Sequence, residues 1–158
     1  MTTRKKISFT LITAFIAIQF MQPARNISGQ VLPTDISKTV AIRGNVQDIL
    51  RTACYDCHSN NTRYPWYSRI QPVGWWLDSH INEGKEALNF SEFGSYSPRR
   101  QISKFREMEG SIRDGSMPLS SYTLIHRKAQ LTKEDKDSLM AWIQNAKDSL
   151  NVNAKIFQ

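Results

Sequence analysis

The two cysteines of the chain, Cys54 and Cys57, lie three positions apart, and His58 follows directly. With this spacing, two thiols can add to the two vinyl groups of one haem, and the adjacent imidazole can reach the iron from the same side. A Cys-x-x-Cys-His sequence is typical of c-type haem attachment, and a proximal histidine is a normal iron ligand. The motif therefore predicts one covalently attached haem c, with His58 as a ligand of its iron.

Three other uses of a cysteine pair fit the sequence less well. A structural zinc site needs four ligands, but the other histidines, His80 and His126, are far from the pair and are not arranged as in a zinc finger. A thioredoxin-like redox pair is expected in a βαβ setting, which the sequence lacks. A simple disulfide suits an exported protein but gives no reason for a histidine at the next position.

Met117 is the best candidate for the second axial ligand of the iron. Methionine often partners histidine in cytochromes c, where it raises the reduction potential. Met117 lies between Gly115 and Pro118, in an expected loop, although a loop methionine can also simply fill a hydrophobic gap. His80, on the apolar face of a predicted helix, is the main rival, and His126 is a weaker one. An open or water-bound iron is the remaining alternative.

Four helical patterns are expected to position these residues, and no segment shows a sustained two-residue alternation. The first runs from about Asn45 into the cysteine motif, and the second begins near Pro72, with an apolar face that includes Val73 and Trp76. The third has Ser97 as its N-cap and Gly115 as its stop. The sequence therefore predicts an all-α, cytochrome c-like domain over residues 43–158, built around one covalent haem.

The fourth helix has the strongest pattern. Thr132 and Asp135 resemble a capping box in which Asp replaces Glu. The residues that follow at helical spacing are apolar: Leu139, Trp142, Ile143, Ala146 and Leu150. Because the first and fourth helices each have one apolar stripe, we expect them to pack together, with Val46 and Ala53 facing Trp142 or Ile143.

The N-terminus has the pattern of an export signal. Arg4, Lys5 and Lys6 precede a mostly apolar run over residues 7–21. As a helix this run measures about 22 Å at ~1.5 Å per residue, which is short of a hydrocarbon core of ~30 Å. Residues 1–25 are predicted to be a signal peptide or membrane anchor, and residues 26–42 a linker. The protein is then exported and periplasmic, either soluble or anchored to the inner membrane by residues 7–21.

The net charge of +7 says little about partners. Arg4, Lys5, Lys6 and Arg25 contribute four of these charges, which leaves about +3 (7 − 4) for the rest of the chain. A nucleic-acid-binding protein concentrates basic residues on one face, whereas here they are mixed with acidic ones. No nucleic-acid partner is therefore expected. The expected partner is an unidentified redox protein, with membrane association through the N-terminal segment.

Three stretches of the sequence closely resemble the bacterial haem-binding domain family. They are CYDCHSNNTRYPWY at residues 54–67, LNFSE at 88–92 and MPLSSYTLIH at 117–126, and the likeness covers about residues 40–150. The resemblance implies haem binding and an exported setting, but it supplies neither a redox partner nor a reaction. The order of parts also resembles class I cytochromes c, in which a proline carbonyl accepts a hydrogen bond from the proximal histidine. This likeness makes Pro72 or Pro65 the expected acceptor for His58.

Electron transfer with His/Met axial ligation is the function that these features favour. The alternatives are a haem-based sensor or interaction module, whose distal ligand a small gas displaces, and a small peroxidase-like enzyme, with His80 as its acid–base group. The sequence favours a carrier over an enzyme, because no catalytic triad, phosphate loop or paired-carboxylate motif stands out. A dense set of aromatic residues is expected to pack around the haem: Tyr64, Trp66, Tyr67, Trp75 and Trp76.

Overall fold

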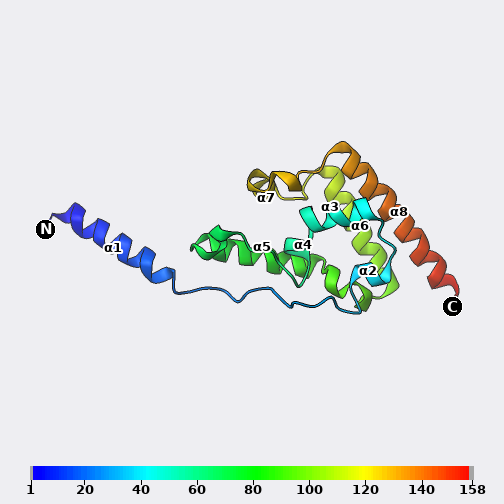
Figure 1. The fold of residues 1–158 in the computed structure, drawn as a ribbon, viewed down its shortest axis with the longest axis horizontal. Coiled ribbons are helices and arrows are strands. Elements are labelled where there is room, and N and C mark those ends of the chain that lie inside the picture. Colours follow the sequence, from blue (N-terminus) through cyan, green and yellow to red (C-terminus); the bar gives the residue numbers. More distant parts are fainter. Residues whose placement is uncertain (1, 157–158) are drawn as a thin grey trace.

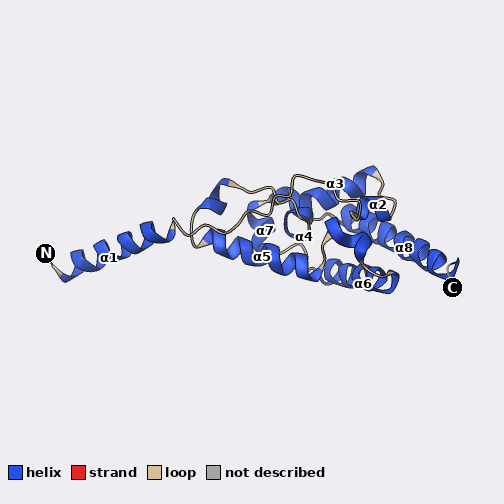
Figure 2. Cartoon of the chain, turned by 90° about the horizontal axis from the view of Figure 1, so that it is seen from below, coloured by secondary structure: helices blue, strands red, loops and turns tan. Residues whose placement is uncertain are grey.

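A computed structural model describes residues 2–156 of the chain. The α-helices are α1 (Thr3–Ile18), α2 (Ile36–Thr39), α3 (Gly44–Ala53), α4 (Tyr55–His58), α5 (Val73–Ala87), α6 (Pro98–Asp114), α7 (Ser120–Ile125) and α8 (Lys133–Ile156). Short 3₁₀ segments are η1 (Trp66–Arg69), η2 (Phe90–Ser95) and η3 (Arg127–Ala129). Over these residues there is no strand, only an isolated bridge between Ile27 and Asn61. The predicted all-α class is confirmed (Figure 2).

The ends of the two long helices follow their capping residues. The Ser97 side chain accepts a hydrogen bond from the Arg100 N–H at the start of α6. Gly115 follows α6 with φ of +76°, the left-handed conformation that glycine adopts without a steric penalty. At the start of α8, Asp135 Oδ2 accepts a hydrogen bond of 2.9 Å from the Thr132 N–H, and the Asp135 N–H donates to Thr132 Oγ1 at 3.1 Å. The predicted N-cap, stop and capping box are therefore confirmed.

The hydrophobic core lies where α3 and α6 pack on α8, at the end of the molecule that holds the C-terminus (Figure 1). Val46 lies in this core together with Trp142 and Ile143, whereas Ala53 lines a cavity beside it. The indole of Trp142 meets the Phe105 ring edge-on, with 5.3 Å between ring centroids. The expected contact between the first and fourth predicted helices is thus confirmed, and Val46, but not Ala53, belongs to the core that they share.

The helix α5 extends from this core toward α1 and packs on η1 and α4 (Figure 1). Its buried residues are Gly74, Ile81 and Gly84, while Val73 and Trp76 are exposed. The apolar face predicted for this helix is therefore wrong in part. The two glycines let the backbone of α5 come close to its neighbours, so the contact face combines these small residues with the large apolar side chain of Ile81.

The residues before the predicted linker form two parts: α1, which is exposed, and the residues after α1, which contact the domain. Every described side chain from Thr2 to Ala17 is exposed, and α1 projects away from the body (Figures 1 and 2). Among residues 2–156, no helix combines the length and apolar character needed to cross a membrane. The export signal and the anchor stay predictions. Further along, Ile36 and Val40 are buried in the core, so the core begins before the expected boundary at residue 43.

Residues 19–28, which we call the N-terminal strap, lie along the domain through hydrogen bonds. Gln19 and Gln71 pair twice, because the Gln71 N–H donates to Gln19 Oε1 at 2.9 Å and Gln19 Nε2 donates to the Gln71 carbonyl at 3.2 Å. Farther along the strap, Asn26 Nδ2 donates to the Ser59 carbonyl and to Thr62 Oγ1. The strap therefore contacts the loop that follows the cysteine motif.

Candidate functional site

The cysteine motif forms a separate helical turn after α3. Cys54 has φ of −128° and ψ of −43°, so the helix is interrupted there, and α4 begins at Tyr55. The N–H groups of Cys57 and His58 both donate to the Cys54 carbonyl, at 3.2 and 3.0 Å. This turn places the two thiols and the imidazole close together, as attachment of a single macrocycle requires.

Two adjoining cavities of about 160 and 290 Å³ lie against this turn. Both are lined by Ala53, His58, Ala87, Met117 and Pro118. Cys54 lines the smaller cavity and Cys57 lines the larger one. All four residues predicted for haem attachment and iron ligation therefore border these two neighbouring cavities, and His58 and Met117 line both of them.

The imidazole of His58 is held in one tautomer. Its Nδ1 lies 3.0 Å from the Leu88 carbonyl oxygen, which can only accept, so Nδ1 carries the proton and Nε2 keeps its lone pair. Burial lowers the pKa of His58, and hydrogen bonds to the carbonyls of Leu88 and Gly84 oppose this shift. The neutral imidazole with a free Nε2 is the form that ligates a metal. The acceptor is Leu88, so the expectation of Pro72 or Pro65 is wrong.

The two cysteines are half-buried, and their thiols are protonated at neutral pH. Burial raises the pKa of the Cys54 thiol to about 12, with a further contribution from Cys57, and raises that of Cys57 to about 11, with a further contribution from Asp56. Reactive redox pairs instead have lowered thiol pKa values. Within residues 2–156, no three side chains of His, Cys, Asp or Glu converge to hold a metal ion, whereas a structural zinc site needs four ligands.

Met117 is fixed by the end of α6. The helix stops at Gly115, and the Met117 N–H donates to the Ser111 carbonyl in the last turn, at 3.1 Å. His80 also lines the larger cavity; its Nδ1 donates to the Trp76 carbonyl at 2.8 Å, which leaves its Nε2 free. His126 lines neither cavity and is hydrogen-bonded to the Tyr67 hydroxyl instead. The structure thus places Met117 and His80, but not His126, beside His58.

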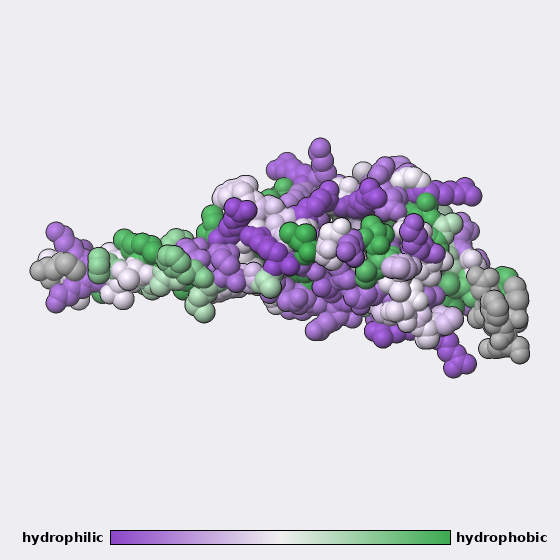
Figure 3. All heavy atoms as spheres, turned by 60° about the horizontal axis from the view of Figure 1, so that its bottom comes forward, coloured by the Kyte–Doolittle hydropathy of each residue, from purple (hydrophilic) through white to green (hydrophobic). Residues whose placement is uncertain are grey.

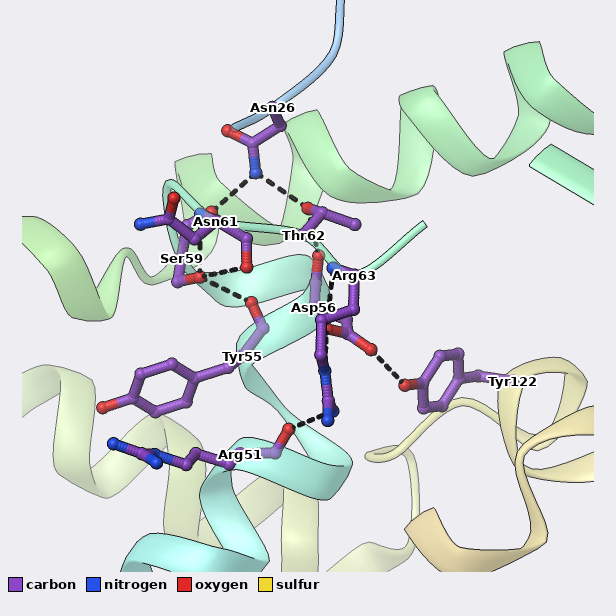
Figure 4. A network of polar contacts seen from close by, with 9 residues as sticks. All are labelled: Asn26, Arg51, Tyr55, Asp56, Ser59, Asn61, Thr62, Arg63 and Tyr122. Atoms are coloured by element: carbon purple, nitrogen blue, oxygen red, sulfur yellow. Dashed lines mark hydrogen bonds and ion pairs between the residues drawn. The ribbon is translucent and has the colours of Figure 1, made fainter. Parts of the chain in front are cut away.

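A polar network holds the motif turn in place (Figure 4). Asp56 Oδ1 accepts from the Arg63 backbone N–H at 3.1 Å and from Arg63 Nε at 3.2 Å, while Oδ2 accepts from the Tyr122 hydroxyl at 2.9 Å. Asp56 lies two positions before His58, and Tyr122 lies five positions after Met117. The Asp56–Tyr122 hydrogen bond therefore joins the His58 side of the cavities to the Met117 side. Sequence reasoning did not identify this pair, because the two residues are far apart in the chain.

Gly84 brings α5 against the motif. A Cβ atom at this position would lie 2.7 Å from the Cys57 carbonyl oxygen, so only glycine fits without a shift of the backbone. Sequence reasoning also missed this contact. Its one signal was a glycine in the interior of a predicted helix, which costs helix stability and therefore often has a packing reason.

The aromatic set does not surround the cavities. Trp66, Trp75 and Trp76 are exposed and line neither cavity, so the expected packing of these residues around a cofactor is wrong. The cavity walls are mainly aliphatic, with Phe90 and Tyr122 as their aromatic members. Each cavity has mainly apolar walls, one cysteine, and the nitrogen and sulfur donors of His58 and Met117, and this set of residues suits a haem.

The family model described as "Haem-binding domain" matches residues 13–145. The chain therefore belongs to the haem-binding domain family, as the resemblance of the motif segments predicted. Membership of this family supports haem binding by the chain. No curated protein and no solved structure gives a significant match to the chain.

Proposed function

We propose that the chain is an electron-transfer protein with one c-type haem, attached through Cys54 and Cys57 and ligated by His58 and Met117. One observation carries the proposal: these four side chains border two adjoining cavities that share His58 and Met117 as lining residues. The haem would supply a one-electron iron couple. A neutral thioether favours ferrous iron, so His/Met ligation is expected to give a higher potential than histidine with water.

The chain's own residues have separate parts in this proposal. Two thioether bonds from Cys54 and Cys57 would fix the macrocycle at one edge. The Leu88 carbonyl holds His58 with Nε2 free, since its oxygen accepts from Nδ1 at 3.0 Å, and such contacts to a ligand histidine tune the metal. Met117 would supply the second iron ligand, and an iron with both ligand positions filled offers no ready site for a substrate, which supports a carrier rather than an enzyme.

Covalent attachment is tested by extraction. The protein is made in a host with haem-attachment machinery, denatured and extracted with acid–acetone. The wild-type chain should keep its haem, and Cys54→Ala/Cys57→Ala should lose it, because both thioether bonds need a thiol. Wild-type protein that releases all its haem into the solvent would refute covalent attachment.

The role of Met117 is tested by spectroscopy with a second methionine as control. Oxidised wild type should show the weak far-red sulfur-to-iron band, and Met117→Ala should abolish it, lower the potential and open the iron to carbon monoxide. Met117→His should restore a low-spin, six-coordinate iron at a lower potential. Met108 lines only the smaller cavity and packs against the core, so Met108→Ala should keep the band. An unchanged spectrum in Met117→Ala would remove Met117 as a ligand.

The position of His80 favours a second candidate, a haem sensor or a small peroxidase-like enzyme. Its free Nε2 borders the same cavity as Met117, where it could ligate iron or act as an acid–base group. In that case, reduced wild type would bind carbon monoxide rapidly, and His80→Ala would change the spectrum while Met117→Ala would not. Slow binding by wild type and fast binding by Met117→Ala would exclude this candidate.

We also propose that the protein is exported to the periplasm, where it is either soluble or anchored to the inner membrane by residues 7–21. The basic residues before an apolar run support export, and thioether attachment of haem takes place outside the bacterial cytoplasm. Cell fractionation with detection of covalent haem tests this. Haem-bearing protein in the cytoplasmic fraction would contradict it.

A further inference from the structure

One end of the domain, which we call the aromatic end, exposes five large apolar side chains: Trp66, Ile70, Val73, Trp75 and Trp76. They come from η1, the loop after it and the first turn of α5, and η1 packs against α5. Trp66 is 78% exposed and Trp76 is 49% exposed, which is unusual for tryptophan on a soluble surface. Several large apolar side chains exposed at one end of a domain indicate an interaction site.

The N-terminal strap fastens α1 to this same end. Gln19, which caps α1, pairs with Gln71 just before α5, and the Trp75 indole N–H donates to the Met21 carbonyl at 2.7 Å. Figures 1 and 2 both show α1 leaving the body there, and Figure 3 shows apolar residues along α1. The exposed apolar side chains of this helix are Ile7, Phe9, Leu11, Ile12, Phe15 and Ile16.

A cationic hollow of about 420 Å³ adjoins the aromatic end. Arg25, Arg69 and Trp66 line it, and no carboxylate does. The Arg25 guanidinium lies over the Tyr64 ring at 4.3 Å and donates to Ser68 Oγ at 2.9 Å. Guanidinium groups match the geometry of a phosphate and can bind it bidentately.

We propose that the aromatic end rests on a lipid bilayer at the level of the headgroups, with α1 in the same membrane. The hollow between Arg25 and Arg69 takes the phosphate of an anionic phospholipid. Tryptophan is enriched at membrane–water interfaces because its ring is apolar and its N–H is polar. A bilayer is favoured over a second copy of the chain, because the exposed apolar helix, the tryptophans and the arginines occupy one end. The proposal rests on membrane anchoring by the N-terminal segment, one of the two alternatives proposed above, but not on haem or its ligands.

Lipid photo-crosslinking of the full-length protein tests the placement. The vesicles contain phosphatidylcholine, phosphatidylglycerol and a phospholipid with a diazirine near its headgroup, and labelled residues are mapped by mass spectrometry. Labels are expected on α1 and on residues 66–76. Leu124 and Ile125 in α7, which are 75% and 60% exposed, are the matched control and should stay unlabelled. Labels on α1 alone, or equal labelling of α7, would overturn the proposal, as would chain-to-chain cross-links at residues 66–76.

The phosphate part is tested by charge. In vesicles of phosphatidylcholine alone, labelling of residues 66–76 should be several-fold lower than in the mixed vesicles. In the mixed vesicles, Arg25→Gln/Arg69→Gln should show the same decrease relative to wild type. In both cases α1 should still be labelled. Arg99→Gln/Arg106→Gln, which removes two exposed arginines of α6, is the control and should change nothing. Undiminished labelling of residues 66–76 both in phosphatidylcholine vesicles and in the Arg25/Arg69 variant would overturn the headgroup site.

Discussion

Replacement of Gly84 by alanine should push α5 away from the cysteine motif. The added Cβ would lie 2.7 Å from the Cys57 carbonyl oxygen and 3.2 Å from the Cys57 carbonyl carbon and Cβ, whereas ordinary contacts begin at 3.4 Å. One of the two backbones must therefore move by about 0.7 Å (3.4 − 2.7). The move would also displace Leu88, four residues on, whose carbonyl orients His58.

The size of the effect follows from two opposing contributions. Overpacking of a close contact costs about 1–3 kcal/mol, while alanine gains about 1 kcal/mol over glycine in a helix interior. Gly84→Ala should therefore lower the free energy of unfolding by about 0–2 kcal/mol. Gly110, in α6, isolates the second contribution, because nothing lies within 4 Å of a Cβ placed there. Gly110→Ala should stabilise the protein by about 0.4–1 kcal/mol.

Urea unfolding of both variants beside wild type, followed by far-UV circular dichroism, measures this difference. The yield of covalent haem in the same preparations reports on the motif, and it should fall for Gly84→Ala only. Equal stabilisation of the protein by the two alanines, with unchanged haem yield, would show that α5 does not contact Cys57 as described.

Three further changes test other contacts. Tyr122→Phe removes the hydrogen bond to Asp56, so the Met117 loop should be cleaved faster by a protease than in wild type. In a double-mutant cycle, Asp56→Asn should increase the cleavage rate of the Tyr122→Phe variant only a little, because the hydrogen bond is already lost. Trp142→Ala should cost roughly 3–5 kcal/mol in urea unfolding, since Trp142 of α8 is buried against Phe105 of α6; a cost below about 1 kcal/mol would contradict that burial. The hydrogen bond from Lys147 lowers the pKa of Glu109, so its stabilisation is present above the ordinary glutamate pKa of 4.5 and is lost as pH falls through the lowered value. Wild type should therefore exceed Glu109→Gln in stability at pH 7 but not in strong acid, and a constant difference would refute this linkage.

Local signals in the sequence predicted the helices well. Ser97, Gly115 and the Thr132–Asp135 pair act on backbone groups within a few residues, so each can be read without knowledge of the tertiary structure. The packing of α3 on α8 was also predictable, because each helix has a single apolar stripe. The α5 face was not, because glycine gives no hydrophobic signal even where it makes the closest contact.

Part of the candidate site could likewise be predicted from the sequence, and part of it could not. Cys54, Cys57, His58 and Met117 could be named from the chemistry of their side chains, and they border adjoining cavities. The Leu88 carbonyl could not be named, because every residue has such a group and only the fold decides which one His58 meets.

The N-terminal strap also determines how freely the domain can move relative to α1. A flexible linker of n residues lets its two ends separate by about 5–6 Å × √n, so a domain on such a tether samples many orientations. Here Gln19 is both the cap of α1 and a partner of Gln71, so no slack chain separates the helix from the body. The distance from α1 to the cavities is therefore set by folding. An inserted Gly-Ser spacer after Gln19 would change both reach and orientation, even if every contact within the domain were kept.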